Sequence, residues 1–248
     1  DIKSQSVRTQ KDVAIKEMSE LQKTIIKNRR YNDENTRKEI IEEIADVEGK
    51  RTKEFLQAKA QDYKVNIVGG SVAIKEHKQF YNTTYIVDKQ GKLISEYRKV
   101  HLFRLMDEDK YLAAGNQKNV FELAGVKSAS FICYDIRFPE WLRTVAKEKL
   151  SVIYVVAQWP QTRIEQWKAL LVARAIENQT YVVAVNRVGD NPDNKFNGHS
   201  LIINPLGEVL SDSGDQETLT VYDLDTSEME KFTQQIHVFE DRRPELYD

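Results

Sequence analysis

The chain has 248 residues, of which 40% are hydrophobic and 31% are charged, and its formal net charge is −2 at pH 7. This composition is sufficient for a hydrophobic core and an ordinary charged surface, and the net charge gives no reason to expect nucleic-acid binding. The sequence has no apolar run of the ~20 residues that a membrane span requires, and its start does not resemble a signal peptide. We therefore expect a cytoplasmic protein. The single cysteine excludes an internal disulfide framework, and the four histidines lack metal-ligand spacing, so we expect no bound metal.

The first quarter of the chain predicts helices. Apolar residues recur every three or four positions over residues 9–27, which is the helical period. Thr36 with Glu39 forms a capping pattern before a second apolar stripe, and Gly49 is a natural stop for that helix. A third helix is predicted over residues 52–63.

Strands dominate after residue 65. Asp88 to Lys92 contains a turn signal between two apolar runs and predicts a hairpin. Predicted strands cover residues 65–74, 81–87, 93–97, 120–123, 129–133, 152–157, 181–185, 200–203 and 219–224. Helices are predicted over residues 140–149 and 162–178, the latter with Trp167, Leu170, Leu171 and Ile176 on its inner side.

Alternating strands and helices, mixed with hairpins, predict an α/β fold with a mixed sheet. No linker rich in Pro, Gly or Ser divides the chain, so we expect a single domain over residues 1–248.

Cys133 stands at the end of an apolar strand, and Pro139 can begin the helix that follows. At a strand end a thiol can face a cleft, where backbone N–H groups and the positive helix terminus favour the thiolate that attacks a carbonyl carbon. A free cysteine is also among the most buried residue types and is usually inert. Placement alone leaves both interpretations open.

Two motifs resemble those of the nitrilase superfamily of carbon–nitrogen hydrolases. The segment CYDIRFPE at residues 133–140 resembles the nucleophile motif, and YRKVHLF at residues 97–103 resembles the lysine motif. Within the family, AQWP at 157–160, ARAIENQ at 173–179 and NRVG at 186–189 resemble the omega-amidase branch. The resemblance runs from about residue 65 to the C-terminus, and it implies a four-layer α-β-β-α sandwich that pairs into a homodimer.

The resemblance also assigns roles. Amide hydrolysis by a thiol needs a nucleophile, a group that stabilises the oxyanion, and a proton carrier. Cys133 would be the nucleophile, and Lys99 would lower the pKa of the thiol and hold the oxyanion, with the backbone N–H of Tyr134 as a second donor. Glu108 matches a second acid that orients the lysine and the substrate, although an acid in a charged loop is more often solvated. Trp159 could wall the substrate pocket or belong to the core.

Four charged residues of these motifs are interpreted as structural rather than catalytic. Asp135 and Arg137 are expected to form an ion pair or to fix the turn around Cys133 rather than to react. Arg174 and Glu177 could brace the nucleophile loop, or form a surface pair at their helical spacing of three.

The family's general-base glutamate has no clear counterpart. It would follow an early apolar strand, but counting back from Lys99 leads to the polar residues 30–34, where Glu34 is the nearest carboxylate. Glu34 or another acid could substitute, the base could be lost, or the first 64 residues as written could differ from the native chain.

The leading hypothesis is a cofactor-free amidase that releases ammonia from a small-molecule omega-amide, such as 2-oxoglutaramate, through a thioester. The first alternative is a catalytically impaired scaffold that binds a metabolite or a protein partner. The second is a cysteine–histidine hydrolase with His101 or His199 as its base.

Overall fold

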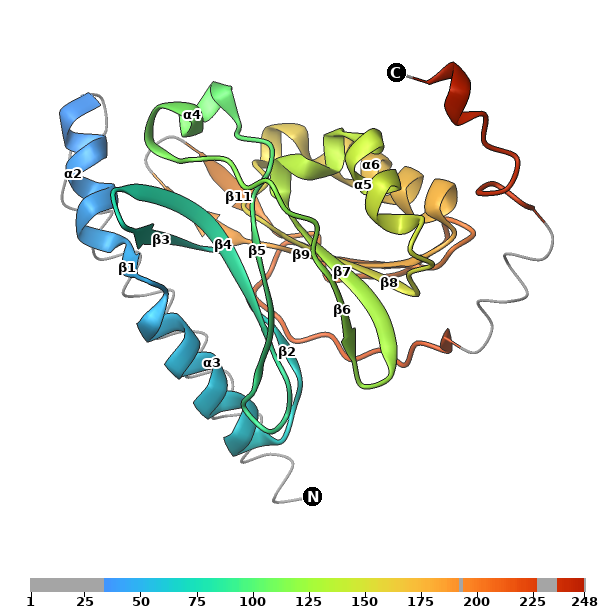
Figure 1. The fold of residues 1–248 in the computed structure, drawn as a ribbon, viewed down its shortest axis with the longest axis horizontal. Coiled ribbons are helices and arrows are strands. Elements are labelled where there is room, and N and C mark those ends of the chain that lie inside the picture. The colour runs from blue at the N-terminus through green and yellow to red at the C-terminus, as the bar shows by residue number, and fades with distance from the viewer. Residues whose placement is uncertain (1–33, 192–193, 227–235, 248) are drawn as a thin grey trace.

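The computed structural model describes residues 34–191, 194–226 and 236–247, so the helix predicted over residues 9–27 lies outside the described part. The described elements form the expected four layers, with two sheets packed face to face and helices on both outer sides (Figure 1). In this part of the chain, no helix is both long and apolar enough to cross a membrane.

The first sheet has five strands in the order β1-β3-β4-β2, and β5 also pairs with β4. Strands β4 and β5 form the predicted hairpin. Two helices, α2 and α3, precede most of this sheet in the chain. The bounds are α2 Glu34–Ile44, β1 Asp46–Val47, α3 Lys50–Tyr63, β2 Ile67–Val68, β3 Val72–Glu76, β4 Gln79–Val87 and β5 Leu93–Arg98.

The second sheet has six strands in the order β13-β12-β9-β8-β7-β6, and its central strands β7, β8 and β9 are parallel. Their mostly buried residues explain the continuous apolar runs in the sequence, because a central parallel strand is covered on both faces. The bounds are β6 Val120–Leu123, β7 Val126–Ile132, α5 Pro139–Ala146, β8 Val152–Ala157, α6 Ile164–Asn178, β9 Tyr181–Asn186, β12 Leu201–Ile203 and β13 Val209–Asp212. Strands β10 (Val188–Asp190) and β11 (Lys195–Asn197) form a separate antiparallel ribbon.

Three apolar clusters fill the spaces between the four layers. Tyr85 and Val87 of β4 pack against α3, whereas Ile86, between them, packs against Phe121 of the second sheet. This alternation is the period of two that places successive strand residues on opposite faces. The largest cluster joins β7, β8 and β9 to α5 and α6.

The region after α2 differs from the prediction. The second helix was expected to continue to Gly49, but residues 46 and 47 instead form β1, which runs parallel to β3. Gly49 precedes α3 with a φ of 64°, and a Cβ there would lie 2.0 Å from the Tyr85 hydroxyl oxygen. Gly49 is therefore required by a left-handed turn and a close contact, and it stands at the start of α3 rather than at the end of α2.

Two further expectations were wrong. Residues 219–224 do not form a strand, and Val221 is 77% exposed. Their alternating apolar residues have no sheet face to cover. Ile176 was expected on the inner side of α6 but is 48% exposed, because the neighbouring inward positions belong to Arg174 and Ala175.

Candidate active site

A cavity of about 720 Å³ contains the predicted site residues. Lys99, Glu108, Cys133, Tyr134 and Trp159 all line it. They come from the end of β5, the start of α4 (Glu108–Tyr111), the end of β7 and the end of β8. The fold thus brings into one cavity residues that are as many as 60 positions apart in the chain.

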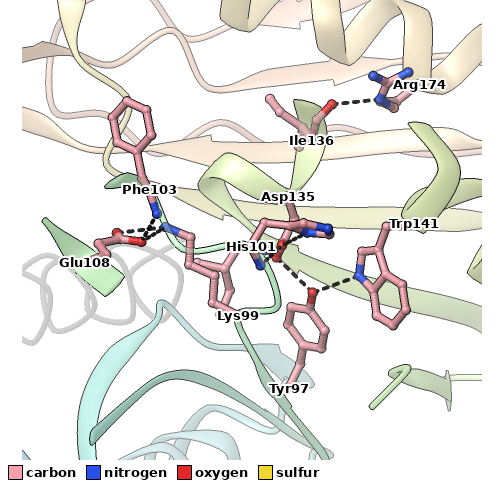
Figure 2. A network of polar contacts seen from close by, with 10 residues as sticks. Tyr97, Lys99, His101, Phe103, Glu108, Asp135, Ile136, Trp141 and Arg174 are labelled. Atoms are coloured by element: carbon pink, nitrogen blue, oxygen red, sulfur yellow. Dashed lines mark hydrogen bonds and ion pairs between the residues drawn. The ribbon is translucent and has the colours of Figure 1, made fainter. Parts of the chain in front are cut away.

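Lys99 follows β5 directly and is only 1% exposed. Its backbone is held on both sides, because its N–H donates to the Asn82 carbonyl and its carbonyl accepts from Gly115 N–H. A buried ammonium needs a paired charge. Nζ donates to both carboxylate oxygens of Glu108, at 2.7 and 2.5 Å (Figure 2). Lys99 is therefore a buried, paired cation rather than the solvated surface lysine that was the alternative.

Glu108 is fixed from a second direction. Besides the ammonium of Lys99, its carboxylate accepts the backbone N–H of Phe103 at 2.8 Å. Two independent donors thus determine where the carboxylate lies and, through it, where Nζ of Lys99 points. These contacts are compatible with the orienting role expected of Glu108, which stays a prediction.

Cys133 is the first residue of a short 3₁₀ helix, Cys133–Arg137, that follows β7 directly. Its φ is 48°, in the left-handed region, which costs a residue other than glycine about 1–2 kcal/mol. Pro139 then begins α5, as predicted. The nucleophile candidate thus stands on a strained turn between a strand and a helix.

The protonation of Cys133 differs from the expectation. Burial raises the pKa of its thiol to about 11, although the Lys99 ammonium and the Gln158 backbone N–H act in the opposite direction. The charge of Glu108 raises this pKa further. At neutral pH and without substrate, the Cys133 thiol is therefore protonated, and its attack on a carbonyl carbon requires a proton acceptor.

Aromatic rings form the walls around the nucleophile. The ring of Tyr134 lies 4.7 Å from that of Phe103 and 5.1 Å from that of Phe138, measured between ring centres. Trp159 lines the cavity and is also 3% exposed, with its backbone N–H bound to Asn186 and its indole N–H bound to the Arg163 carbonyl. Trp159 is therefore a core residue that also lines the cavity, and its contact with a substrate stays a prediction.

The charged neighbours of Cys133 act on its turn. Asp135 is fully buried and binds Tyr97, His101 and Ile132, so it fixes the turn without an ion pair to Arg137 among the described contacts. Arg174 donates through Nε to the Ile136 carbonyl at 2.8 Å and pairs with Glu177. Arg174 therefore braces the nucleophile loop, as was considered.

Sequence reasoning gave Arg137 a structural role and assigned no arginine to the pocket. Four arginines line the cavity, and three of them, Arg137, Arg163 and Arg187, follow β7, β8 and β9 respectively; the fourth is Arg51. The guanidinium of Arg137 stacks over Trp159, 4.9 Å from the ring centre, and that of Arg163 lies over Phe103. The signal was available, because residues that follow adjacent parallel strands gather at one sheet edge.

The carboxylates that could move a proton are also placed. Glu43, Asp46 and Glu108 line the cavity, and Asp46 is engaged at the start of α3, where it accepts the backbone N–H groups of Arg51 and Thr52. Glu34 begins α2, and its side chain lies outside the described atoms. Neither His101 nor His199 lines the cavity; the ring of His199 instead binds Asp212.

Comparisons with known proteins give the family. The family model described as carbon-nitrogen hydrolase matches residues 34–234, so the likeness begins upstream of residue 65, where the motifs had placed it. A 2-oxoglutaramate amidase from Bacillus subtilis is 49% identical over 207 residues, which are 84% of this chain and 80% of that protein.

Solved structures agree with the sequence match. The carbon-nitrogen hydrolase superfamily protein XC1258 from Xanthomonas campestris, solved with an arsenic adduct in its active site, has a TM-score of 0.76 and 30% identity, covering 83% of this chain and 79% of its own. A mutant amidase from Nesterenkonia sp. AN1 carries the acetamide moiety of fluoroacetamide on its active-site cysteine; it has a TM-score of 0.69 and 26% identity, covering 80% of this chain and 72% of its own. The chain belongs to the carbon-nitrogen hydrolase family, the nitrilase superfamily that the nucleophile and lysine motifs indicated.

Proposed function

We propose that this chain is an omega-amidase that hydrolyses the terminal amide of a dicarboxylic acid monoamide, such as 2-oxoglutaramate, through a thioester on Cys133. The observation that carries the proposal is the buried Lys99–Glu108 pair in the same cavity as the lone thiol. The 2-oxoglutaramate amidase relative supports the substrate, and the acetamide adduct in the Nesterenkonia structure supports the cysteine as nucleophile.

The first half-reaction forms the thioester. Glu108 takes the proton of the Cys133 thiol, and the sulfur attacks the amide carbon. The carbonyl oxygen becomes anionic and is held by the Lys99 ammonium and the Tyr134 backbone N–H. Proton transfer neutralises Glu108, so the ammonium is no longer shared with a carboxylate and is available to the oxyanion. Glu108 then returns the proton to the nitrogen, the carbon–nitrogen bond breaks, and ammonia leaves.

The second half-reaction regenerates the thiol. Water loses a proton to Glu108 and attacks the thioester carbon, and the carbon–sulfur bond breaks. The sulfur recovers a proton, and the carboxylic acid is released. One carboxylate thus serves as acid and base in alternate steps, which microscopic reversibility permits.

The arginines of the cavity give a reason for the dicarboxylic substrate. A guanidinium binds a carboxylate through two parallel hydrogen bonds, and Arg137 and Arg163 present such groups beside Trp159 and Phe103. They would hold the carboxylate end of the substrate while the amide end reaches Cys133.

Ammonia release from 2-oxoglutaramate by the full chain tests the proposal, with Cys133→Ala as the inactive variant. We expect turnover that the variant abolishes, and unchanged turnover in the variant would refute the mechanism. The missing counterpart of the family's general-base glutamate near residues 30–34 favours a second candidate, a scaffold that binds the amide without hydrolysing it. Intact mass spectrometry separates the two: a thioester that persists on Cys133 indicates lost base function, and binding without an adduct or turnover favours the scaffold.

A further inference from the structure

Asp135 is a buried carboxylate whose hydrogen bonds are fully used. It has no exposed surface, and each of its oxygens accepts two donors, among them Tyr97 and His101 (Figure 2). Oδ1 accepts the backbone N–H and the ring Nδ1 of His101, at 3.0 and 2.8 Å. Oδ2 accepts the Tyr97 hydroxyl at 2.8 Å and the Ile132 backbone N–H at 3.1 Å. A carboxylate surrounded by donors in this way acts as an acceptor only.

These donors belong to the two segments that carry the proposed chemistry. Tyr97 and His101 stand two residues before and two residues after Lys99, and Ile132 directly precedes Cys133. The lysine segment and the nucleophile segment are thus joined through one side chain. Hydrogen bonds to both segments fix the position of the Asp135 side chain between them.

The nucleophile side of this junction is strained. Cys133 has a φ of 48°, which a residue other than glycine adopts only where its surroundings impose it. The bond from Ile132 N–H to Asp135 closes the turn around Cys133, and the Arg174–Ile136 bond holds the same loop from α6. Without the Asp135 bond, one of these two constraints is lost.

The segment that carries Lys99 is also fixed by several contacts. The Tyr97 hydroxyl accepts the indole N–H of Trp141 at 3.1 Å and donates its own proton to Asp135. Burial and the Asp135 charge raise the pKa of Tyr97, so the hydroxyl keeps the proton that it donates. The ring of His101 stacks on Phe138, with 3.7 Å between ring centres.

We infer that Asp135 is a positioning residue that sets the distance between the Lys99 ammonium and the Cys133 sulfur. The inference rests on the proposed roles of these two groups. Asp135 itself has no contact with the substrate and moves no proton. It determines whether the cation lies where it stabilises the thiolate and the oxyanion.

Asp135→Asn tests this inference, because it keeps the size of the side chain while one oxygen becomes an NH₂ group facing two donors. A misplacement of about 1 Å at an active site costs about 100-fold in rate. We therefore expect kcat for the omega-amide to fall about 100-fold with KM changed less than about threefold. A role confined to folding would lower the melting temperature and leave kcat per folded molecule unchanged, which would overturn the inference.

The reactivity of the thiol gives a second readout with a distinctive sign. Cys133 is the only cysteine of the chain, so alkylation by iodoacetamide reports on it alone. The Asp135 charge raises the pKa of the thiol, and Lys99 lowers it by a larger amount. If Asp135 acted only as a charge, Asp135→Asn would speed alkylation at pH 8. Because we expect the variant to displace Lys99, we expect slower alkylation.

A matched control and a milder variant complete the test. Asp212 also accepts a histidine Nδ1 and a backbone N–H, from His199 and Gly214, but lies outside the cavity lining, so Asp212→Asn should leave kcat and alkylation unchanged. If Asp135→Asn does not fold, Tyr97→Phe removes one of the four bonds and should lower kcat about tenfold, and a wild-type kcat in it would refute the inference. If the native chain releases no ammonia, the proposed function fails, and the alkylation rates still decide whether Asp135 positions the lysine.

Discussion

Lys99→Met removes the ammonium and keeps most of the side-chain volume. The carboxylate of Glu108 then loses two of its three described hydrogen bonds and keeps only the one from Phe103 N–H. Breaking one partner of a buried pair costs about 3–5 kcal/mol. Glu108 retains 19% exposure, so we expect the lower end, about 3 kcal/mol, which lowers the melting temperature by roughly 6–12 °C.

The same variant should lose catalysis for a separate reason. Removing one oxyanion donor lowers kcat by about 10²–10³-fold. The thiol pKa also rises above its value of about 11, because the Lys99 ammonium that lowers it is gone. Circular dichroism gives the melting temperature, and coupled detection of ammonia gives kcat for 2-oxoglutaramate.

A double variant separates the two losses. Adding Glu108→Gln to Lys99→Met leaves no unpaired carboxylate, so stability should return to within about 1 kcal/mol of the native chain. Activity should stay low, because neither the oxyanion donor nor the proton carrier is restored. A Lys99→Met variant that retained kcat within threefold would refute this account and favour a histidine as the active group.

Three further predictions follow from single features. The rate of Cys133 alkylation should rise with pH with a midpoint near pH 11, and a midpoint below pH 9 would contradict this. Because the pKa of the thiol in the folded chain exceeds the unfolded value of about 8.5, the free energy of unfolding should also decrease as pH rises from about 9 to 11. Gly49→Ala should lower the melting temperature more than Gly125→Ala, since both have positive φ but only the first places a Cβ against the Tyr85 hydroxyl; equal shifts in calorimetry would argue against the clash. Arg163→Met should reduce kcat/KM for 2-oxoglutaramate about 10–100-fold and leave an amide without a carboxylate unaffected, and equal losses for both substrates would exclude carboxylate recognition.

Local patterns predicted most elements of the described fold because their causes are local. The hairpin of β4 and β5 and the start of α5 at Pro139 each depend on residues within a few positions. Strand β1 was missed because its two residues become a strand only through pairing with residues of β3 that lie 28 positions further on. The false strand at residues 219–224 has the same origin, since its pattern lacks a partner strand.

The sequence predicted which residues share the cavity better than it predicted the pKa of the Cys133 thiol. Cys133, Lys99 and Glu108 were found through motifs, and the cavity contains all three. The expected low thiol pKa considered only the nearby positive groups. Burial by segments distant in the sequence dominates instead, and the charge of Glu108 adds to it. The extent of this burial cannot be read from the residues next to Cys133 in the sequence, so its effect on the thiol pKa was not predicted.

The arginines of the cavity are an example of residues whose proximity follows from the fold topology and not from any local sequence pattern. Arg137, Arg163 and Arg187 are separated by 26 and 24 positions, and no local pattern relates them. Each comes within six residues of the end of a strand that the apolar runs predicted, and an α/β alternation implies that such strands are parallel. Since the carboxyl ends of adjacent parallel strands lie at one edge, the loops after β7, β8 and β9 lie on the same side as Cys133, and all three arginines line its cavity. Arginines in the pocket next to Cys133 are thus consistent with strand order, and under the proposed function they would bind the carboxylate of the amide substrate.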